Sequence, residues 1–392
     1  MTWQQRWETS MMKNYGQPPL MLTRGQGSRV WDDAGNEYID LIAGIAVNAL
    51  GHGHPAFVSA ITDQLNTIGH TSNLYATEPG LELAERLLVL ANAPVKSRVF
   101  FCNSGAEANE AAFKLSRLTG RTHVVVAAGG FHGRTMGSLA LTAQPAKQDP
   151  FRPLPGEVTV VPYGDVLALR EAITSETAAV FLEPIQGEGG VIVAPQGYLT
   201  AARSACDEHG ALLILDEVQT GIGRTGAWFA YQHEGITPDV VTLAKGLGGG
   251  LPIGALMAFG ESANLFTPGS HGSTFGGNPI SARAALTVLD VITEEQLLGH
   301  VMVMNERLVK ELPEVSSGVV THVRGQGLLL AAELSSESSA QFEPLLRKHG
   351  LLTNAVAPDA IRMAPALNIS HIDVDEVLER WAKASAELLS TT

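Results

Sequence analysis

The stretch from residue 178 to residue 245 decides the fold, because one pattern recurs in it. It contains three short apolar runs, AAVFLEP (178–184), ALLILDE (211–217) and DVVTLAK (239–245). Between the first two lies YLTAARSACDEHG (198–210), whose apolar residues recur with helical spacing. Apolar runs that do not alternate with polar residues, and that are separated by helices, are typical of parallel strands covered on both faces. The stretch therefore predicts an α/β fold.

The same pattern continues on both sides of this stretch. Further buried strands are predicted at RVFFCN (98–103), HVVVAA (123–128), VTVV (158–161) and GALMAFG (254–260). The segment EANEAAFKLSRLTG (107–120) has the spacing of a helix. Together these runs predict a mostly parallel, seven-stranded sheet covered by helices.

The two ends of the chain differ from this centre. Residues 27–41 predict a hairpin around the turn 33–36, DAGN. After about residue 280 the chain turns helical, then gives a strand pair, VTHVRGQGLLLAAEL (320–334), and a final helix from Asp373. We therefore expect two domains: a large one over residues 46–279, and a smaller α+β one formed by residues 1–45 and 280–392.

Composition and charge exclude several classes of function. The chain has 392 residues, 45% of them hydrophobic and 17% charged, which is typical of a globular protein. Lys and Arg number 26 against 40 Asp and Glu, so the net charge is −14. Such a surface repels nucleic-acid phosphates and anionic lipids, which argues against nucleic-acid and membrane partners. Any anionic ligand must therefore be bound by locally placed Arg and Lys.

The cysteine content and the length of the apolar runs indicate in which cellular compartment the protein is expected. Two cysteines, Cys102 and Cys206, allow neither a disulfide framework nor a thiolate zinc site, and we expect no metal. The first residues lack the apolar core of a secretion signal, and no apolar run approaches the ~20 residues of a membrane-spanning helix. We expect a cytoplasmic protein.

Common nucleotide and hydrolase motifs are absent or misplaced. The sequence has no GxxxxGK[ST], HExxH or GxSxG, which argues against P-loop, zincin and serine-hydrolase chemistry. A GxGxxG does occur at 221–226, but residues 217–220 separate it from the strand that ends at Asp216. The next strand ends in Lys245, where a dinucleotide site needs an acidic residue.

Chemically informative residues instead follow the predicted strands, where open α/β sheets bind ligands. Asp216 and Lys245 each close a buried strand, and a lysine held away from water becomes a nucleophile. After the strand at 98–103, Ser104 suits an N-cap in a capping box with Glu107. The small residues beside it, Gly105 and Ala106, also leave backbone amides free for a phosphate at a helix N-terminus.

Taken together, these parts match what pyridoxal phosphate requires. The cofactor needs a lysine that forms a Schiff base, an acid that keeps the pyridine nitrogen protonated, and a phosphate cradle. Phe131, in FHGR (131–134), is an aromatic residue that could stack on the ring, although an ordinary core phenylalanine explains it equally well.

The sequence resembles the class III, fold-type I, pyridoxal-phosphate-dependent aminotransferases over nearly its whole length. The resemblance rests on these segments: WDDAGNEYIDL, GHGHP, HTSNLY, NSGAEANEAAFKL, FHGRTMGSLALT, EPIQGEGG, LDEVQTGIGRTG, DVVTLAKGLGGGLPIGA, HGSTFGGNP and IRMAPAL. The order of LDEVQTG, TLAKG and GSTFGGNP is especially specific to this family.

The resemblance implies roles for the cofactor-binding residues. Lys245 would carry the cofactor and move the proton, and Asp216 would pair with the pyridine nitrogen. The other implied cofactor contacts are Gln219 to the ring hydroxyl, Phe131 stacked on the ring, and Ser104, Gly105 and Ala106 around the phosphate. Thr274 would reach the phosphate of a neighbouring subunit, so the resemblance implies a homodimer with shared active sites.

The resemblance also implies how substrates bind. Both substrates bring carboxylates, which arginines bind bidentately, and Arg134 and Arg362 match the family's two. Glu188 would pair with Arg362 while the amine donor is bound, although a purely structural pair would look the same. Tyr15 and Ser273 match further substrate contacts. Ile45 stands where ornithine-specific members have a tyrosine, which argues against free ornithine.

The function expected from this resemblance is transfer of the terminal amino group of N2-acetyl-L-ornithine to 2-oxoglutarate, a step of arginine biosynthesis. The products would be N-acetyl-L-glutamate 5-semialdehyde and L-glutamate. Ornithine, 4-aminobutyrate, succinylornithine and succinyl-diaminopimelate remain alternative donors. An aminomutase of the glutamate-semialdehyde kind, or a nonenzymatic cofactor-binding regulator, are alternatives from other classes.

Overall fold

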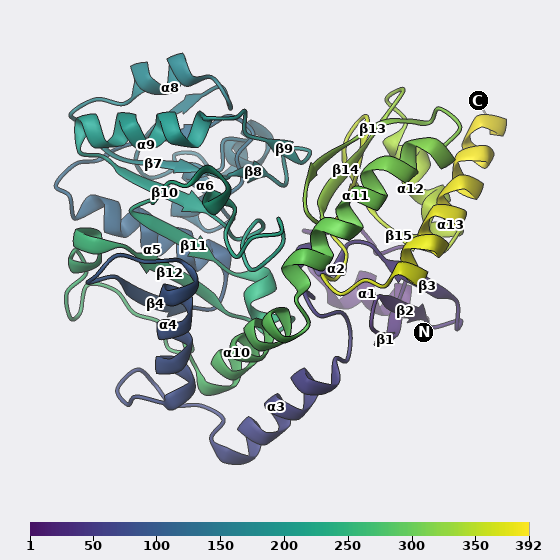
Figure 1. Ribbon diagram of the computed structural model, residues 1–392, viewed down its shortest axis with the longest axis horizontal. Coiled ribbons are helices and arrows are strands. Elements are labelled where there is room, and N and C mark those ends of the chain that lie inside the picture. The colour runs from purple at the N-terminus through teal and green to yellow at the C-terminus, as the bar shows by residue number, and fades with distance from the viewer. Residues whose placement is uncertain (392) are drawn as a thin grey trace.

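The computed structural model describes residues 1–391, and a seven-stranded sheet forms the core of the lobe on the left of Figure 1. The strand order is β4-β12-β11-β10-β7-β5-β6. Strand β12 runs antiparallel to its neighbours β11 and β4, whereas the pairs β11–β10, β10–β7, β7–β5 and β5–β6 are parallel. The predicted α/β fold with a mostly parallel seven-stranded sheet is therefore confirmed.

The bounds of all elements are as follows. The strands are β1 (Leu22–Gln26), β2 (Arg29–Asp32), β3 (Glu37–Asp40), β4 (Arg98–Cys102), β5 (His123–Ala127), β6 (Glu157–Val161), β7 (Thr177–Leu182), β8 (Ile185–Gln186), β9 (Ile192–Val193), β10 (Leu212–Asp216), β11 (Val240–Leu243), β12 (Gly254–Ala258), β13 (Val320–Gln326), β14 (Leu329–Leu334), β15 (Leu351–Leu352), β16 (Asn354–Ala357) and β17 (Ala360–Met363). The α-helices are α1 (Trp3–Ser10), α2 (Ala43–Ala46), α3 (Pro55–Thr67), α4 (Glu78–Leu90), α5 (Gly105–Arg117), α6 (Met136–Leu141), α7 (Pro145–Gln148), α8 (Val166–Ala172), α9 (Tyr198–His209), α10 (Pro279–Glu294), α11 (Leu297–Val315), α12 (Ser339–Lys348) and α13 (His371–Thr391). Short 3₁₀ helices are η1 (Asp149–Phe151), η2 (Ala230–Glu234), η3 (Lys245–Gly248) and η4 (Gly260–Asn264).

The central strands are buried because helices cover both faces of the sheet. Strands β7, β11 and β12 have no exposed residue, as expected for non-alternating apolar runs. Helix α5 packs over β10, β11 and β12, and α9 packs against β7 and β10. The four parallel neighbours β5, β7, β10 and β11 end at the same edge, so the loops that follow them meet there.

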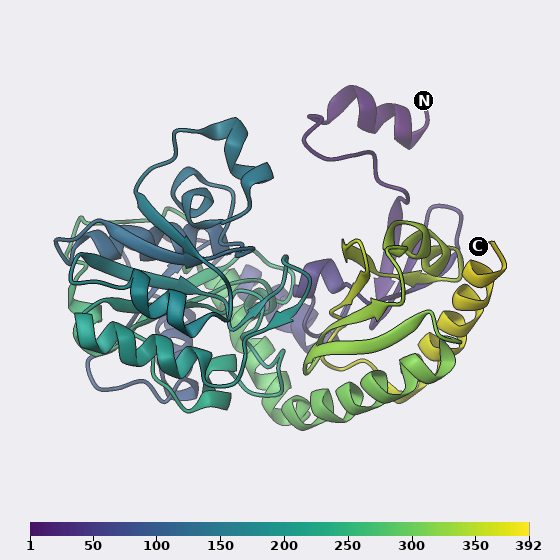
Figure 2. The ribbon, with the colours of Figure 1, turned by 90° about the horizontal axis from the view of Figure 1, so that it is seen from above.

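A second lobe is built around the four-stranded antiparallel sheet β13-β14-β17-β16. Helices α10 and α11 run from the central sheet to this lobe, where α11 packs on β13 (Figure 2). The predicted hairpin forms β2 and β3, and β3 pairs in parallel with β15 from the C-terminal region. The two ends of the chain thus share one small sheet. The predicted division into domains 46–279 and 1–45 plus 280–392 stays a prediction.

The start of the final helix differs from the prediction. The final helix begins at His371, two residues before the predicted Asp373, and Ser370 and Asp373 exchange hydrogen bonds at its start.

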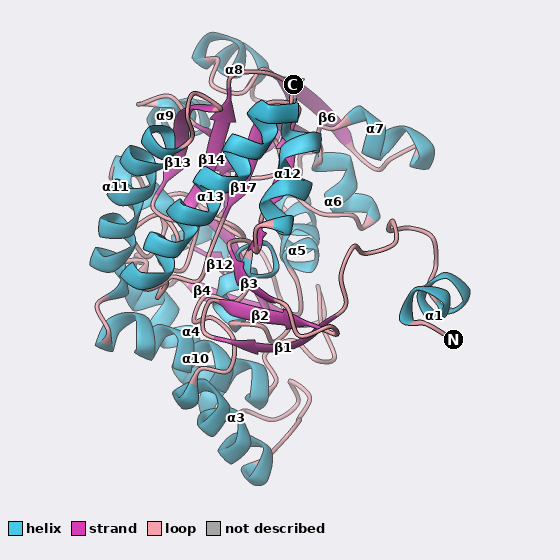
Figure 3. Ribbon diagram, turned by 90° about the vertical axis from the view of Figure 1, so that its right-hand side faces the viewer, coloured by secondary structure: helices cyan, strands magenta, loops and turns pink. Residues whose placement is uncertain are grey.

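Helix α1 projects from the body of the molecule, and none of its residues is buried (Figure 3). No helix within residues 1–391 combines the length and the apolar character needed to cross a bilayer.

Candidate active site

A cavity of about 250 Å³ lies at the sheet edge where β5, β7, β10 and β11 end. Its walls come from the loops that follow these four strands and from the first turns of α5. The lining residues are Gly105, Ala106, Asn109, Phe131, His132, Gly133, Arg134, Glu183, Glu188, Asp216, Val218, Gln219 and Lys245. Most of the residues singled out from the sequence therefore converge in one place.

Asp216 and Lys245 are brought together by the register of two adjacent strands. In the parallel pair β10–β11, Asp216 lies opposite Thr242, three residues before Lys245. Both side chains then line the same cavity, although 29 residues (245 − 216) separate them in sequence.

The carboxylate of Asp216 is buried and surrounded by N–H donors. Its Oδ2 accepts hydrogen bonds from Asn109 Nδ2 at 2.7 Å and from His132 Nδ1 at 2.8 Å. Its Oδ1 accepts from the backbone amide of Val218 at 3.0 Å. Asn109 is itself held, because its Oδ1 accepts from the Thr242 hydroxyl at 2.8 Å. This network fixes an acid at the floor of the cavity.

His132 is the second titratable group at the floor of the cavity. Burial disfavours its protonated ring, but the hydrogen bond and the negative charge of Asp216 outweigh burial, so the pKa of His132 is raised. His132 is almost fully buried, and its ring packs edge-on to Phe181 of β7. A protonated His132 would strengthen the hold on the Asp216 carboxylate.

Lys245 begins η3 directly after β11 and has an unusual backbone. Its φ is +46°, a region that residues other than glycine seldom occupy and that is concentrated at functional sites. Burial lowers the pKa of Lys245, and the nearby charge of Arg362 acts in the same direction. The carboxylate of Glu188 opposes this shift. The result is an amine that loses its proton more readily than a surface lysine.

The N-terminus of α5 forms one end of the cavity. Ser104 is the N-cap, and its hydroxyl accepts from the amide of Glu107 at 3.2 Å, as predicted. The other half of the predicted capping box differs, because the Glu107 carboxylate accepts from the amide of Asn103 instead of Ser104. A Cβ at Gly105 would lie 2.8 Å from the side chain of Val218, so only glycine fits there. Small residues thus leave the positive helix end open to an anion.

Arg362, on β17 of the second lobe, reaches the edge of this cavity. It is 1% exposed, and its Nη1 forms an ion pair with Glu188 Oε1. The same nitrogen lies 3.4 Å from Gln219 Oε1, while Nη2 donates to Asn354 Oδ1 at 2.8 Å. The Nε of Arg362 has no hydrogen-bond partner within residues 1–391. Arg362 is thus a buried cation, and its ion pair with Glu188 connects it to the wall of the cavity.

The Glu188 side of this pair is partly open to the cavity. Burial raises the pKa of Glu188, but the charge and hydrogen bond of Arg362 outweigh it, so the pKa is lowered overall. Glu188 keeps 27% of its side chain exposed, whereas Arg362 keeps 1%. The carboxylate is therefore the member of the pair that can move.

The mouth of the cavity is cationic. The guanidinium of Arg134 lies 5.7 Å from the ring centre of Phe131, and the ammonium of Lys147 lies 5.9 Å from it. Arg134 is exposed and has no carboxylate within ion-pair distance among the described residues. Arg134 is thus available to an anionic ligand, in contrast to Arg362.

Glu183 contributes a buried carboxyl group near the cavity floor. It accepts hydrogen bonds from the amide of Phe131 at 2.7 Å and from the amide of Gly187 at 3.2 Å. Burial raises the pKa of Glu183 to about 7, although the positive charge of His132 opposes this. Glu183 thereby ties the Phe131 loop to the Glu188 loop.

Five residues proposed from the sequence do not line the cavity. Ser104 and Arg362 adjoin it, through Gly105 and through the ion pair with Glu188, and the other three lie farther away. Ser273 and Thr274 line a separate hollow on the other side of Asn103, where Ser273 Oγ accepts from Asn103 Nδ2 at 3.2 Å. Tyr15 is 74% exposed, on the segment between α1 and β1. The roles predicted for these residues stay predictions.

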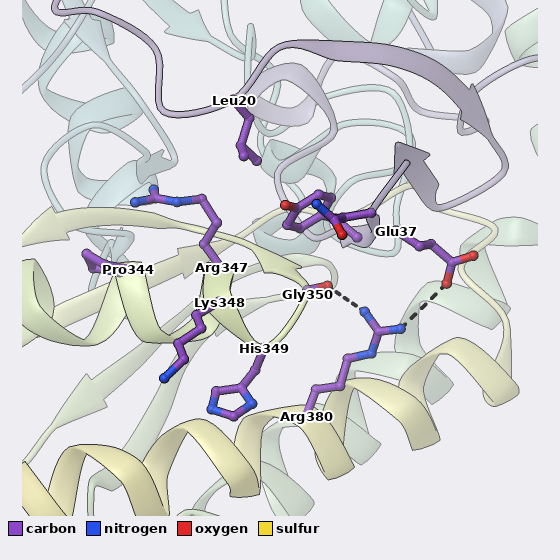
Figure 4. A pocket seen from close by; sticks show the side chains of 10 residues that line it. Leu20, Glu37, Pro344, Arg347, Lys348, His349, Gly350 and Arg380 are labelled. Atoms are coloured by element: carbon purple, nitrogen blue, oxygen red, sulfur yellow. Dashed lines mark hydrogen bonds and ion pairs between the residues drawn. The ribbon is translucent and has the colours of Figure 1, made fainter. Parts of the chain in front are cut away.

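A larger surface pocket, between β3, α12 and α13, is a weaker candidate for anion binding (Figure 4). Its cations are already paired: Arg380 bonds to the Gly350 carbonyl at 2.8 Å and to Glu37 at 3.5 Å. Arg347 and Lys348 are likewise paired with Glu343 and Glu387. The arginines and the lysine that line this pocket are therefore already neutralised by their own carboxylates.

Several lining residues escaped the sequence analysis, namely Asn109, His132, Gly133, Glu183 and Val218. A weak signal existed for some of them. Asn109 follows Gly105 by four residues on one helix, so both share a face, and Glu183 directly follows a predicted strand. His132 stands inside the FHGR segment, where Phe131 is the more recognisable candidate.

The geometry fits pyridoxal 5'-phosphate. One cavity supplies an amine at Lys245, a carboxylate at Asp216 and an open helix N-terminus at Gly105. These three groups match the aldehyde, the pyridine nitrogen and the phosphate of that cofactor. A Cβ at position 105 would collide with Val218, which also lines the cavity, so glycine lets the helix N-terminus and this wall of the cavity approach closely.

Comparisons with known proteins agree with this geometry. The family model described as aminotransferase class-III matches residues 10–384. The acetylornithine aminotransferase of Mycobacterium tuberculosis is 61% identical over 95% of this chain and 94% of that protein. A solved N-acetylornithine aminotransferase from Stenotrophomonas maltophilia is 38% identical, with a TM-score of 0.85, over 98% of this chain and 100% of that one. A solved ornithine aminotransferase from Toxoplasma gondii, with partial occupancy of PLP at its active site, is 30% identical, with a TM-score of 0.93, over 99% of this chain and 94% of that one.

Proposed function

The chain belongs to the class-III aminotransferase family, and on that premise we propose that it transfers the terminal amino group of N2-acetyl-L-ornithine to 2-oxoglutarate. The reaction yields N-acetyl-L-glutamate 5-semialdehyde and L-glutamate, so one amino group and one carbonyl oxygen change places. One observation carries this proposal: the cavity that holds Lys245 is lined by a free arginine, Arg134, and by Glu188, which masks a second arginine, Arg362, beside the cavity. Relatives 55–61% identical and named for acetylornithine support the choice of donor.

The cofactor is pyridoxal 5'-phosphate, and this chain offers it a complete set of contacts. When bound, it supplies a carbonyl group for the substrate amine and a ring that withdraws electrons from the adjacent carbon. We assign Lys245 to the aldehyde, Asp216 to the ring nitrogen, and the amides of Gly105 and Ala106, with Ser104, to the phosphate. Phe131 and Val218 both line the cavity and would hold the ring, and Gln219 would bind its hydroxyl.

Lys245 acts as the proton carrier. Burial lowers the pKa of this amine, which favours the neutral form that a base requires. Its Nζ takes the proton from the substrate carbon that bears the amino group. Asp216, whose Oδ2 accepts hydrogen bonds from Asn109 and His132, would pair with the ring nitrogen and would favour a positive charge there.

The two arginines allow one site to accept two different substrates. The carboxylate of the donor binds Arg134, whose guanidinium is exposed at the mouth, while Glu188 neutralises Arg362. Two carboxylates enter with 2-oxoglutarate, and the second must displace Glu188 to reach Arg362. Glu188 is the more exposed partner, so its side chain is the part that moves.

A homodimer is part of this proposal. Thr274 lies in a hollow outside the chain's own cavity, which suits a contact to a second copy's cofactor. Large apolar side chains near this hollow are exposed in the single chain: Leu74 at 84%, Tyr75 at 74% and Phe275 at 60%. Surfaces of this kind mark interfaces. The cytoplasmic location expected from the sequence stays a prediction.

The test is a half-reaction without acceptor. The cofactor-loaded enzyme is mixed separately with N2-acetyl-L-ornithine, L-ornithine and 4-aminobutyrate, and loss of the cofactor absorbance is followed over time. We expect N2-acetyl-L-ornithine to react fastest. If another donor reacts faster, the substrate assignment is wrong while the family stands. Turnover of a single substrate without 2-oxoglutarate would point to an aminomutase.

A further inference from the structure

Arg224 is a buried cation that the reaction described so far does not use. It lies in the loop between β10 and η2 and is 2% exposed. Burial lowers the pKa of Arg224, and no carboxylate within the described chain offsets this. A buried charge without a counter-ion is costly, so its hydrogen bonds must hold it in place.

Those hydrogen bonds all lead to the second lobe. Arg224 Nη1 donates to the carbonyl of Pro365 at 2.5 Å and to the carbonyl of Leu328 at 3.0 Å. In return, the amide of Leu328 donates to the carbonyl of Arg224 at 2.9 Å. A Cβ on Gly327 would lie 2.3 Å from the Arg224 carbonyl, so the approach of the two segments requires glycine at 327. We call this set of contacts the Arg224 clasp.

Each side of the Arg224 clasp carries part of the active site. The loop that holds Arg224 begins after Asp216 and contains Gln219, both of which line the cavity. Pro365 follows Arg362 by three residues, and Leu328 directly precedes β14, the strand that pairs Ala331 with Arg362 on β17. The clasp thus joins the cofactor side of the cavity to the strand that presents Arg362.

Direct contacts alone hold Arg362 to the cofactor side rather weakly. The bonds from Arg362 Nη1 to Gln219 Oε1 and to the Gly187 carbonyl are long, at 3.4 and 3.2 Å, and the pair with Glu188 must open when 2-oxoglutarate binds. During that step the backbone of β17 needs another anchor. The Arg224 clasp provides two charge-assisted hydrogen bonds that do not involve the groups which move.

We propose that Arg224 is a positioning residue that holds Arg362 at the distance needed to bind the α-carboxylate of a dicarboxylic acceptor. This inference rests on the proposed function only in that Arg362 binds the acceptor and does not depend on which amine is the donor. Loosening the clasp should weaken acceptor binding and spare donor binding at Arg134. A misplacement of about 1 Å at such a site costs up to about 100-fold.

The test compares Arg224→Met and Arg224→Lys with a matched control, Arg121→Met. Arg121 also donates to backbone carbonyls, those of Thr177, His209 and Gly210, but near the start of β5, at the opposite edge of the sheet. Two quantities are measured on the cofactor-loaded proteins. One is the Kd of glutarate, a dicarboxylate without a ketone, by calorimetry, and the other is the KM for each substrate.

We expect Arg224→Met to raise the Kd of glutarate and the KM for the dicarboxylic acceptor by about tenfold or more, with the KM for the amine donor within about twofold. Arg224→Lys should lie between this variant and the wild type, because lysine retains the charge. Arg121→Met should lower the Tm without changing glutarate binding.

Three results would overturn the proposal: unchanged glutarate binding in a folded Arg224→Met, equal weakening of donor and acceptor, or a comparable loss in Arg121→Met. If Arg224→Met does not fold, the Arg224→Lys variant decides. Glutarate binding as tight as in the wild type in this variant would then contradict the proposal. A wrong amine donor would leave these glutarate results intact, so the two failures are distinguishable.

Discussion

Glu188 and Arg362 form an ion pair at the cavity wall although 174 positions separate them in the chain. Glu188 lies in the segment that follows β7 of the central sheet, and Arg362 lies on a strand of the second lobe. The pair therefore depends on how the two lobes are joined. It makes the charge of Arg362 available only to a ligand that displaces Glu188.

Replacing Arg362 tests this arrangement. We expect Arg362→Ala to slow the half-reaction with 2-oxoglutarate by about 10- to 100-fold, the worth of a lost charge-assisted contact, and to slow the donor half-reaction far less. Rapid-mixing absorbance measurements on each half-reaction give both rates. Equal slowing of the two halves would show that Glu188 does not mask Arg362 selectively.

Replacing Glu188 should have the opposite effect. Glu188→Gln leaves Arg362 without its counter-charge, so 2-oxoglutarate no longer competes with a carboxylate for it. We expect the KM for this acceptor to fall about two- to tenfold and L-glutamate to become a relatively better donor. Steady-state kinetics with both donors check this. An unchanged KM for the acceptor would contradict the masking scheme.

Asn109 should control how well Asp216 holds the cofactor. Asn109→Leu removes the 2.7 Å hydrogen bond to Asp216 Oδ2, and we expect the Kd of pyridoxal phosphate to rise about 10- to 100-fold. Titration of the cofactor-free protein, followed by absorbance, measures it. Thr242→Val, which removes only the hydroxyl that orients Asn109, should have a smaller effect. Wild-type affinity in Asn109→Leu would count against Asp216 as the ring partner.

Glu217 should make stability depend on pH. Burial raises the pKa of Glu217 to about 7, above its ordinary value of 4.5, so the folded protein binds more protons than the unfolded one between these values. The contribution of Glu217 is therefore fully present below about pH 4.5 and is lost as pH rises through about 7.

Glu217→Gln removes this titration and keeps an acceptor oxygen for one of the two amides, since Ala230 donates to Oε2 and Tyr231 to Oε1. We expect the free energy of unfolding to fall less between pH 5 and 8 in this variant than in the wild type, by up to about 3 kcal/mol. Urea unfolding at several pH values measures it. Parallel pH profiles for the two proteins would contradict the prediction.

The central sheet was predictable from sequence because its strands are buried on both faces. Continuous apolar runs such as AAVFLEP leave few other structures to choose from, and all seven runs form strands of one sheet. The boundary of the last helix was less predictable, because Ser370 caps it through Asp373, a local contact that moves its start to His371.

The site was predictable in part. Residue type and position at strand ends indicated Asp216 and Lys245, but their meeting depends on the register of β10 against β11, which no local pattern reveals. Asn109 and His132 were missed because a buried amide and a buried imidazole look like ordinary core residues until their shared partner is known.

The most direct test of this account asks which lysine carries the cofactor. The enzyme loaded with pyridoxal phosphate is reduced with borohydride, digested and analysed by mass spectrometry, with Lys245→Ala as the control. We expect the pyridoxyl group on the peptide containing Lys245 in the wild type, and no adduct at the equivalent peptide of the control. An adduct on a different lysine, or none on a cofactor-saturated wild type, would contradict the assignment of this cavity as the active site.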